Sequence, residues 1–179
     1  MSDLFSATRK ENVDRVAPLA ARMRPRRIAD YVGQLQIIGP GKLLRRLIEA
    51  DRLGSIILYG PPGVGKTTLA RILAKCLNCD AGISSKPCGK CDACTEINEG
   101  RFIDLIEVDA ASRTKVEDTR ELLENVQYSP AQGRFKVYLI DEVHMLSNHS
   151  FNALLKTLEE PPPHVKFLFA TTDPQKLPV

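Results

Sequence analysis

An α/β fold built on a parallel sheet is predicted for this 179-residue chain, and two observations predict it. Apolar segments typical of strands alternate with segments that have the apolar spacing of helices, the pattern of strand–helix–strand crossovers. A glycine-rich loop joins the first strand to the helix that follows it. The expected strands are residues 55–59, 102–109, 134–142 and 165–172, and the expected helices are 42–53, 68–77, 116–126 and 147–160.

The composition is that of an ordinary soluble domain, 43% hydrophobic and 26% charged. No apolar run approaches the ~18 residues of a membrane span, and the N-terminus has no signal peptide. We therefore expect a cytoplasmic protein without membrane contact. Residues 1–16 are polar and aperiodic and are expected to form a flexible arm, whereas residues 17–25 are expected to be extended.

Positive charge is concentrated in the first 52 residues, which hold 11 Lys and Arg against 6 Asp and Glu. Such a basic lead-in can meet nucleic acid or the phosphates of a nucleotide. A solvated or interface-paired face explains the same charges equally well, so both interpretations stay open.

Residues 60–67, G-P-P-G-V-G-K-T, match the phosphate-binding loop pattern G-x-x-x-x-G-K-[ST]. An apolar strand that we expect to be buried precedes the loop and a helical pattern follows it, which is the context the motif requires. Glycines let several N–H groups point at one anion, and the helix N-terminus adds its dipole. Lys66 would reach the β- and γ-phosphates, and Thr67 would place its hydroxyl on Mg²⁺. The predicted nucleotide-binding residues here are Gly60, Pro61, Pro62, Gly63, Val64, Gly65, Lys66, Thr67 and Thr68.

Two acids, Asp141 and Glu142, end the apolar strand of residues 134–142. Ligands of open α/β sheets bind at the carboxyl ends of the strands. Asp141 fits the acid that holds Mg²⁺ opposite Thr67, and Glu142 fits the base that orients an attacking water. Thr171 and Thr172 end the next strand and would sense the γ-phosphate, or they are simply β-forming residues before a turn.

Four of the five cysteines, Cys79, Cys88, Cys91 and Cys94, fall within 16 residues. Four thiolates around a tetrahedral ion form the usual structural zinc site, and metal binding would supply the folding energy of such a segment. An iron–sulfur cluster and unligated thiols remain alternatives. Cys76, one helical turn earlier, is expected to be a buried helix residue.

From about residue 75 onward, the chain resembles the gamma/tau family of bacterial DNA polymerase III clamp-loader subunits, which are AAA+ ATPases. The resemblance is carried by the four-cysteine segment and by residues 108–120, 138–146, 151–162 and 170–178. Residues 17–74 look more like replication-associated recombination protein A, another AAA+ ATPase. On this comparison the chain is a mosaic or chimera of two related families with the same nucleotide chemistry.

The resemblance implies a P-loop NTPase of the AAA+ type, with a RecA-like parallel sheet flanked by helices in residues 17–179 and a zinc-binding insertion at residues 76–98. It implies ATP and Mg²⁺ at the loop, with Lys66, Asp141, Glu142 and Thr172 as catalytic residues and Thr171 as the second choice of sensor. It places Tyr31, Val32 and Gly33 near the adenine and Zn²⁺ on the four cysteines. Arg113 and Lys115 would lie near the face turned toward DNA.

Partners implied by the resemblance are the delta and delta-prime loader subunits, the sliding clamp and primer–template DNA. The family's arginine finger, helical lid and collar would lie beyond Val179. Because such a finger is worth about 10³–10⁵ in rate, we expect slow or no ATP hydrolysis by these 179 residues alone. A recombination-associated ATPase at stalled forks and a zinc-stabilised scaffold without turnover are the alternatives. Polymerase chemistry is not expected, because the only suitable acid pair is committed to ATP.

Overall fold

The structure is a computed structural model that describes residues 16–112 and 122–177. Within them, four strands form one parallel sheet in the order β1-β4-β3-β2, which confirms the predicted fold class. All four strand positions were expected, with ends that differ by up to three residues. The strands are β1 (Ile56–Tyr59), β2 (Leu105–Asp109), β3 (Lys136–Asp141) and β4 (Val165–Thr171).

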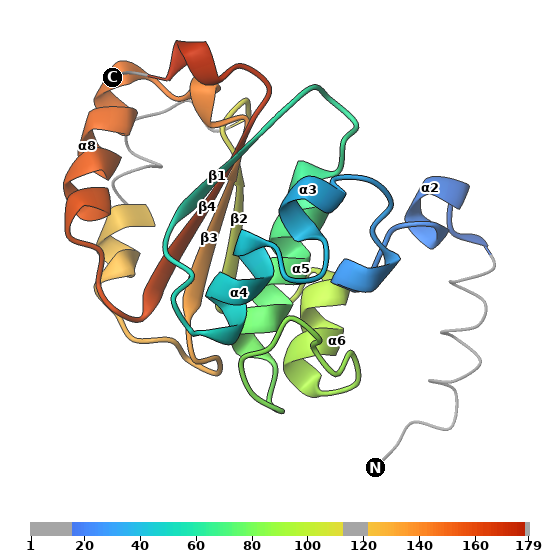
Figure 1. Cartoon of the computed structure of the whole chain (residues 1–179). Helices are drawn as coiled ribbons and strands as arrows, with labels where there is room; N and C mark the ends of the chain where they lie inside the picture. The colour runs from blue at the N-terminus through green and yellow to red at the C-terminus, as the bar shows by residue number, and fades with distance from the viewer. Residues whose placement is uncertain (1–15, 113–121, 178–179) are drawn as a thin grey trace.

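Helices cover both faces of the sheet, with α8 on one side and α3, α4, α5 and α6 on the other (Figure 1). Residues 122–126 are also helical, and the earlier part of that expected helix lies outside the described residues. No helix in the described ranges could span a membrane. The helices are α2 (Leu19–Arg22), α3 (Leu35–Ile38), α4 (Leu43–Glu49), α5 (Lys66–Asn78), α6 (Asp92–Glu99) and α8 (Asn148–Glu159), with short 3₁₀ turns η1 (Ile28–Asp30), η2 (Val143–Met145) and η3 (Pro174–Lys176).

The central strands β3 and β4 are buried on both faces, as parallel strands between helical layers must be. Side chains alternate along β3, so Val137 and Leu139 pack into the core under α4, α5 and α6. Tyr138 and Ile140 point the other way, into the core that α8 covers. The sheet is therefore rigid where β3 delivers Asp141.

The expectation that residues 55–59 form a buried strand is wrong for one face of β1. Ile57 and Tyr59 are 52% and 72% exposed, whereas the strand's other face packs into the core through Ile56 and Leu58. The reason is the strand order, which places β1 at an edge of the sheet beside β4. Apolar residues alone cannot distinguish an edge strand from a central one.

Three further expectations need correction. Residues 17–25 are not extended throughout, because α2 forms within them. The expected helix of residues 42–53 ends early, since Asp51 takes a left-handed φ of 52°. The cysteine segment contains α6, which the sequence pattern did not predict, and the fully buried Ile97 ties this helix to the core beside α5.

Candidate functional site

The loop between β1 and α5 has the shape of an anion cradle. Gly63 and Gly65 have φ values of 80° and 84°, a conformation that side chains rarely adopt. A Cβ on Gly65 would lie only 2.6 Å from the hydroxyl oxygen of Tyr31, so any side chain there would also have to displace the Tyr31 ring. Helix α5 begins at Lys66, and its first N–H groups therefore face the loop.

Lys66 closes the loop on itself. Its ammonium donates hydrogen bonds to the carbonyl oxygens of Gly60 and Pro61 at 2.8 and 3.1 Å. A flexible, charged side chain held only by two carbonyls can turn to a phosphate, a stronger acceptor. The position suits the role that the sequence pattern predicts.

Asp141 and Thr67 lie in contact although 74 residues separate them. The Thr67 hydroxyl donates a 2.6 Å hydrogen bond to Oδ2 of Asp141, and Oδ1 accepts one from the Glu142 N–H at 3.0 Å. A hydroxyl and a carboxylate side by side are oxygen ligands of the kind that Mg²⁺ prefers. These two residues could hold the ion next to the loop.

Glu142 is the residue after β3 and has a left-handed φ of 48°. Such a conformation is uncommon for a non-glycine residue and often marks a functional position. Its Oε2 accepts two 3.0 Å hydrogen bonds, from the N–H and the hydroxyl of Thr172. Thr172 thus contacts the acid that would orient a water, which favours it over Thr171 as the sensor.

His144 is a polar neighbour of this site that sequence reasoning missed. Its Nδ1 lies 2.9 Å from the hydroxyl oxygen of Thr171 and 3.3 Å from Oε2 of Glu142. Thr171 itself is fully buried and also accepts from the N–H of Asp173. The signal was available, because His144 follows the acid pair by two positions.

Beside the loop lies a cavity of about 330 Å³, partly open to solvent. Tyr31 and the 94% exposed Val32 line it, and the Tyr31 hydroxyl donates a hydrogen bond to the Val64 carbonyl oxygen. Gly33 is not among the lining residues. Five residues outside the predicted nucleotide site also line it: Ala20, Met23, Arg24, Pro25 and Asp30.

The four predicted cysteines come together. The sulfur atoms of Cys79, Cys88, Cys91 and Cys94 all lie within 4.8 Å of one another. Zinc–sulfur bonds of about 2.3 Å put tetrahedral sulfurs about 3.8 Å apart, so one ion can contact all four with a small contraction. The N–H groups of Cys88 and Cys91 point at the sulfurs of Cys79 and Cys88, both at 3.3 Å, and would stabilise thiolates.

Cys76 is not part of the cluster. Burial raises the pKa of the Cys76 thiol to about 12, and its side chain belongs to the core of α5, as expected. Hydrogen bonds from the N–H groups of Lys90 and Cys91 lower the pKa of Cys88 to about 6. Burial raises the pKa of Cys94, and an ion would have to displace that proton.

Arg113 and Lys115, the residues expected near DNA, lie outside the described residues. The exposed arginines of the lead-in, among them Arg22, Arg24, Arg26 and Arg27, lie within the described part of the chain. Two of the predicted groups, the loop with its acid pair and the cysteine cluster, are thus geometrically assembled. The adenine group is assembled in part.

Comparisons with known proteins agree with this geometry. The family model described as "DNA polymerase III, delta subunit" matches residues 40–179. The chain is 66% identical over 162 residues to DNA polymerase III subunit tau of Escherichia coli, which covers 90% of this chain and 25% of that protein. It is 56% identical to DNA polymerase III subunit gamma of Buchnera aphidicola subsp. Schizaphis graminum, covering 89% of this chain and 44% of that one. The chain therefore spans a quarter to less than half the length of these relatives.

Solved structures are similar in fold. RuvB of Thermotoga maritima superposes with a TM-score of 0.60 and 22% identity over 87% of this chain and 44% of that one. A DNA polymerase III gamma subunit-related protein from the same organism gives a TM-score of 0.50 and 21% identity over 75% of this chain and 40% of that one. At these identities the likeness shows the fold alone.

The expected change of family near residue 75 is not supported. The tau and gamma relatives match about nine tenths of the chain, so the likeness extends well in front of the cysteine segment.

Proposed function

The chain belongs to the family of DNA polymerase III subunits whose curated relatives are tau and gamma, and on this premise we propose that it is the ATP-binding core of a clamp-loader subunit. Its reaction would be hydrolysis of ATP to ADP and phosphate. The full subunit would couple that reaction to loading of the sliding clamp on primed DNA. It would act in the cytoplasm with the delta and delta-prime subunits.

The observation that carries this proposal is the convergence of Lys66, Thr67, Asp141 and Glu142 on one end of the sheet. Thr67 and Asp141, in contact at 2.6 Å, would hold Mg²⁺, and the bound ion neutralises charge on the phosphates. Lys66 would leave the loop carbonyls for the β- and γ-phosphates. Glu142, held by Thr172, would accept a proton from the attacking water.

Base and ribose would occupy the cavity beside the loop. Tyr31 and Val32 would contact the base, as the resemblance implies, with Arg24 and Pro25 forming another part of the wall. Gly33 would act by allowing the turn that follows, since its φ is 87°. The nucleotide-binding domain would be residues 17–179.

Zinc on Cys79, Cys88, Cys91 and Cys94 would be structural. Four thiolates leave no coordination position for a substrate, and two of the cysteines are fully buried. The ion would fix the insertion of residues 76–98 against α5. A single-ion site fits sulfur atoms this close.

Neither alternative function is favoured by a specific observation. The curated relatives reported above are DNA polymerase III subunits rather than recombination proteins. A scaffold without turnover would not require Glu142 to take a left-handed conformation in contact with Thr172. Both observations support the ATPase.

A graft tests the proposal. Residues 17–177 would replace the matching segment of Escherichia coli tau, and ATP-dependent clamp loading on primed DNA would be measured with the remaining loader subunits. We expect loading by the graft and none by the same graft carrying Lys66→Met. A graft that assembles with its partners but neither hydrolyses ATP nor loads the clamp would contradict the proposed function.

A further inference from the structure

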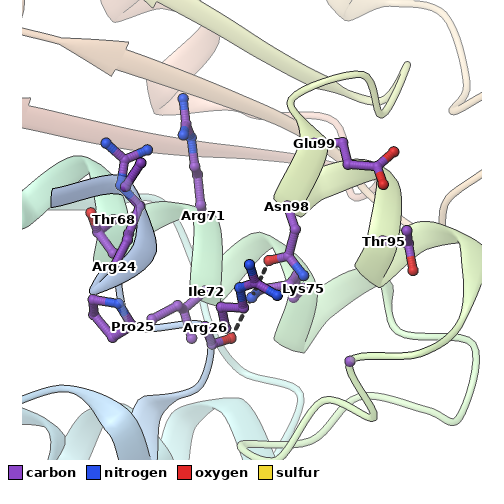
Figure 2. A pocket seen from close by; sticks show the side chains of 12 residues that line it. Arg24, Pro25, Arg26, Thr68, Arg71, Ile72, Lys75, Thr95, Asn98 and Glu99 are labelled. Carbon is purple, nitrogen blue, oxygen red and sulfur yellow. Dashed lines mark hydrogen bonds between the residues drawn. The ribbon is translucent and has the colours of Figure 1, made fainter. Parts of the chain in front are cut away.

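Lys75 is a buried charged residue that the nucleotide chemistry does not use. It lies in α5, two helical turns after Thr68, and is 2% exposed. Its ammonium donates one hydrogen bond to the carbonyl oxygen of Arg26 and another, of 2.7 Å, to Oδ1 of Asn98 (Figure 2). Burying an ammonium is unfavourable unless its donors are satisfied, so these two bonds are what keep the charge inside.

The first partner, Arg26, directly follows two residues in the wall of the candidate nucleotide cavity. Arg24 and Pro25, directly before Arg26, line the cavity beside the phosphate loop. The same two residues line a second cavity of about 330 Å³, which continues along α5 past Lys75 to α6 (Figure 2). The hydrogen bond from Lys75 to the Arg26 carbonyl therefore fixes residues 24–26, which lie between the two cavities.

The second partner belongs to the cysteine insertion. Asn98 lies in α6, a helix whose N-cap is Cys91 and whose first turn carries Cys94. The Arg27 guanidinium also lies near the cysteine segment, 3.9 Å from the position that a Cβ on Gly89 would occupy. An ion that orders the four cysteines would also order α6 and hence Asn98.

Because Lys75 is charged, its burial depends on both of its hydrogen-bond partners, the Arg26 carbonyl and Asn98. Both of its hydrogen-bond partners are neutral, and it has no ion pair with a carboxylate within residues 16–112 and 122–177. Burial lowers the pKa of Lys75. Losing either partner would leave a buried donor unsatisfied, so residues 24–26 and α6 are expected to stay in place together.

We propose that Lys75 is a positioning residue that couples the cysteine insertion to the nucleotide cavity. Through Asn98 and the Arg26 carbonyl, the metal-ordered insertion holds Arg24 and Pro25 in the cavity wall. Loss of the metal or of the Lys75 link then weakens nucleotide binding without any change in the phosphate loop. The inference rests on the nucleotide-binding function proposed above.

The test measures the affinity of the zinc-loaded chain for a fluorescent ATP analogue, with zinc content measured on the same samples. Asn98→Ala removes the exposed end of the link and leaves the cysteines intact. Lys75→Met removes the ammonium, and Lys75→Arg is the conservative rescue. Glu99→Gln, the neighbouring position on α6, is the matched control, since its carboxylate bonds only Arg101 in the described structure.

Asn98→Ala and Lys75→Met are expected to keep their zinc and to bind the analogue at least about fivefold more weakly, with Lys75→Arg in between and Glu99→Gln unchanged. Removing zinc from the wild-type chain should weaken binding by a similar factor. Zinc removal should weaken analogue binding by Asn98→Ala or Lys75→Met only a little further, because the effects of coupled changes are not additive.

The outcomes separate the two proposals. The coupling would be overturned if zinc-loaded Asn98→Ala bound the analogue as tightly as the wild-type chain does. It would also be overturned if zinc removal weakened analogue binding by the same factor in all variants. Either result would leave the nucleotide site standing. No analogue binding by the zinc-loaded wild-type chain would overturn the nucleotide site and the coupling with it. If Lys75→Met does not fold, Asn98→Ala decides, because its side chain is at the surface.

Discussion

The Thr67 hydroxyl and the Asp141 carboxylate are joined by a 2.6 Å hydrogen bond between the first turn of α5 and the end of β3. This contact spans the two halves of the candidate nucleotide site. It places a phosphate-loop hydroxyl beside a strand-end acid. Pre-positioned ligands of this kind reduce the ordering that binding requires.

Thr67→Val should weaken the effect of Mg²⁺ on nucleotide binding. Valine has the shape of threonine but lacks the hydroxyl, so the ion would lose one ligand. We expect the Mg²⁺-dependent gain in affinity to fall by about tenfold, measured by titration with and without Mg²⁺. Thr157→Val, in α8, is the control and should behave as the wild type does. Unchanged Mg²⁺ dependence in Thr67→Val would contradict the assignment.

Glu142→Gln should separate binding from hydrolysis. Glutamine keeps an oxygen that can accept from Thr172 but cannot take a proton from water. Phosphate release by the graft into Escherichia coli tau, measured with the remaining loader subunits and primed DNA, should fall by about 100-fold or more. ATP affinity should stay within about twofold. Glu160→Gln serves as the control, and equal phosphate release by both variants would remove Glu142 from the reaction.

Cys94→Ser should remove the metal and lower stability. Zinc per chain, measured by plasma mass spectrometry, should fall from near one to near zero. The melting temperature should fall by about 5–10 °C, since a ligand that binds only the folded state stabilises it. Cys76→Ser is the matched control, and it should retain zinc although it also disturbs the core. Zinc well below one per chain in the wild type would refute the metal site.

Tyr138→Phe should leave the protein as stable as before or make it more stable. The Tyr138 hydroxyl is buried and has no hydrogen-bond partner among the residues that the structure describes. Removing it takes away an unsatisfied polar group and keeps the ring stacked on Phe167 at 5.3 Å. Chemical denaturation at neutral pH should show the free energy of unfolding unchanged or raised by about 1 kcal/mol. A loss of more than about 2 kcal/mol would show that the hydroxyl is satisfied after all.

The dependence of stability on alkaline pH is a second comparison of the wild-type chain with Tyr138→Phe. Burial raises the pKa of Tyr138 from 10.0 to about 12. The unfolded chain therefore loses this proton first, and stability falls as pH rises from 10 to 12. Tyr138→Phe should lose less stability over that window than the wild-type chain. An identical decline in both would show that other groups cause it.

Sequence reasoning located the parallel sheet, the phosphate loop, the acid pair and the cysteine cluster because each depends on local pattern. Strand–loop–helix order brings Lys66 and Thr67 to a helix N-terminus, and parallel pairing brings Asp141 and Thr172 to the same edge. Cysteine spacing alone indicated four ligands for one ion. In each case the residues that matter are close in sequence or fixed by the sheet.

What sequence reasoning missed depends on tertiary contacts. The exposure of Tyr59 follows from strand order, which a strand's own residues do not determine. Helix α6 is only eight residues long and is held by Ile97 in the core rather than by a strong pattern of its own. His144 joins the site only because the turn after β3 folds back toward Thr171. The sequence pattern marks Lys75 only as a helical residue, because its two hydrogen-bond partners, the Arg26 carbonyl and Asn98, are distant in sequence.

The central claim is that the loop of residues 60–67 binds ATP with Mg²⁺, and calorimetric titration of ATP·Mg²⁺ into the wild-type chain and into Lys66→Met tests it most directly. We predict saturable binding of one nucleotide per wild-type chain. Lys66→Met should bind at least about tenfold more weakly because the phosphate contact is lost. It should remain folded, although it also loses the hydrogen bonds to the carbonyl oxygens of Gly60 and Pro61. Equal affinities for the two proteins, or no binding by the wild type, would contradict the claim.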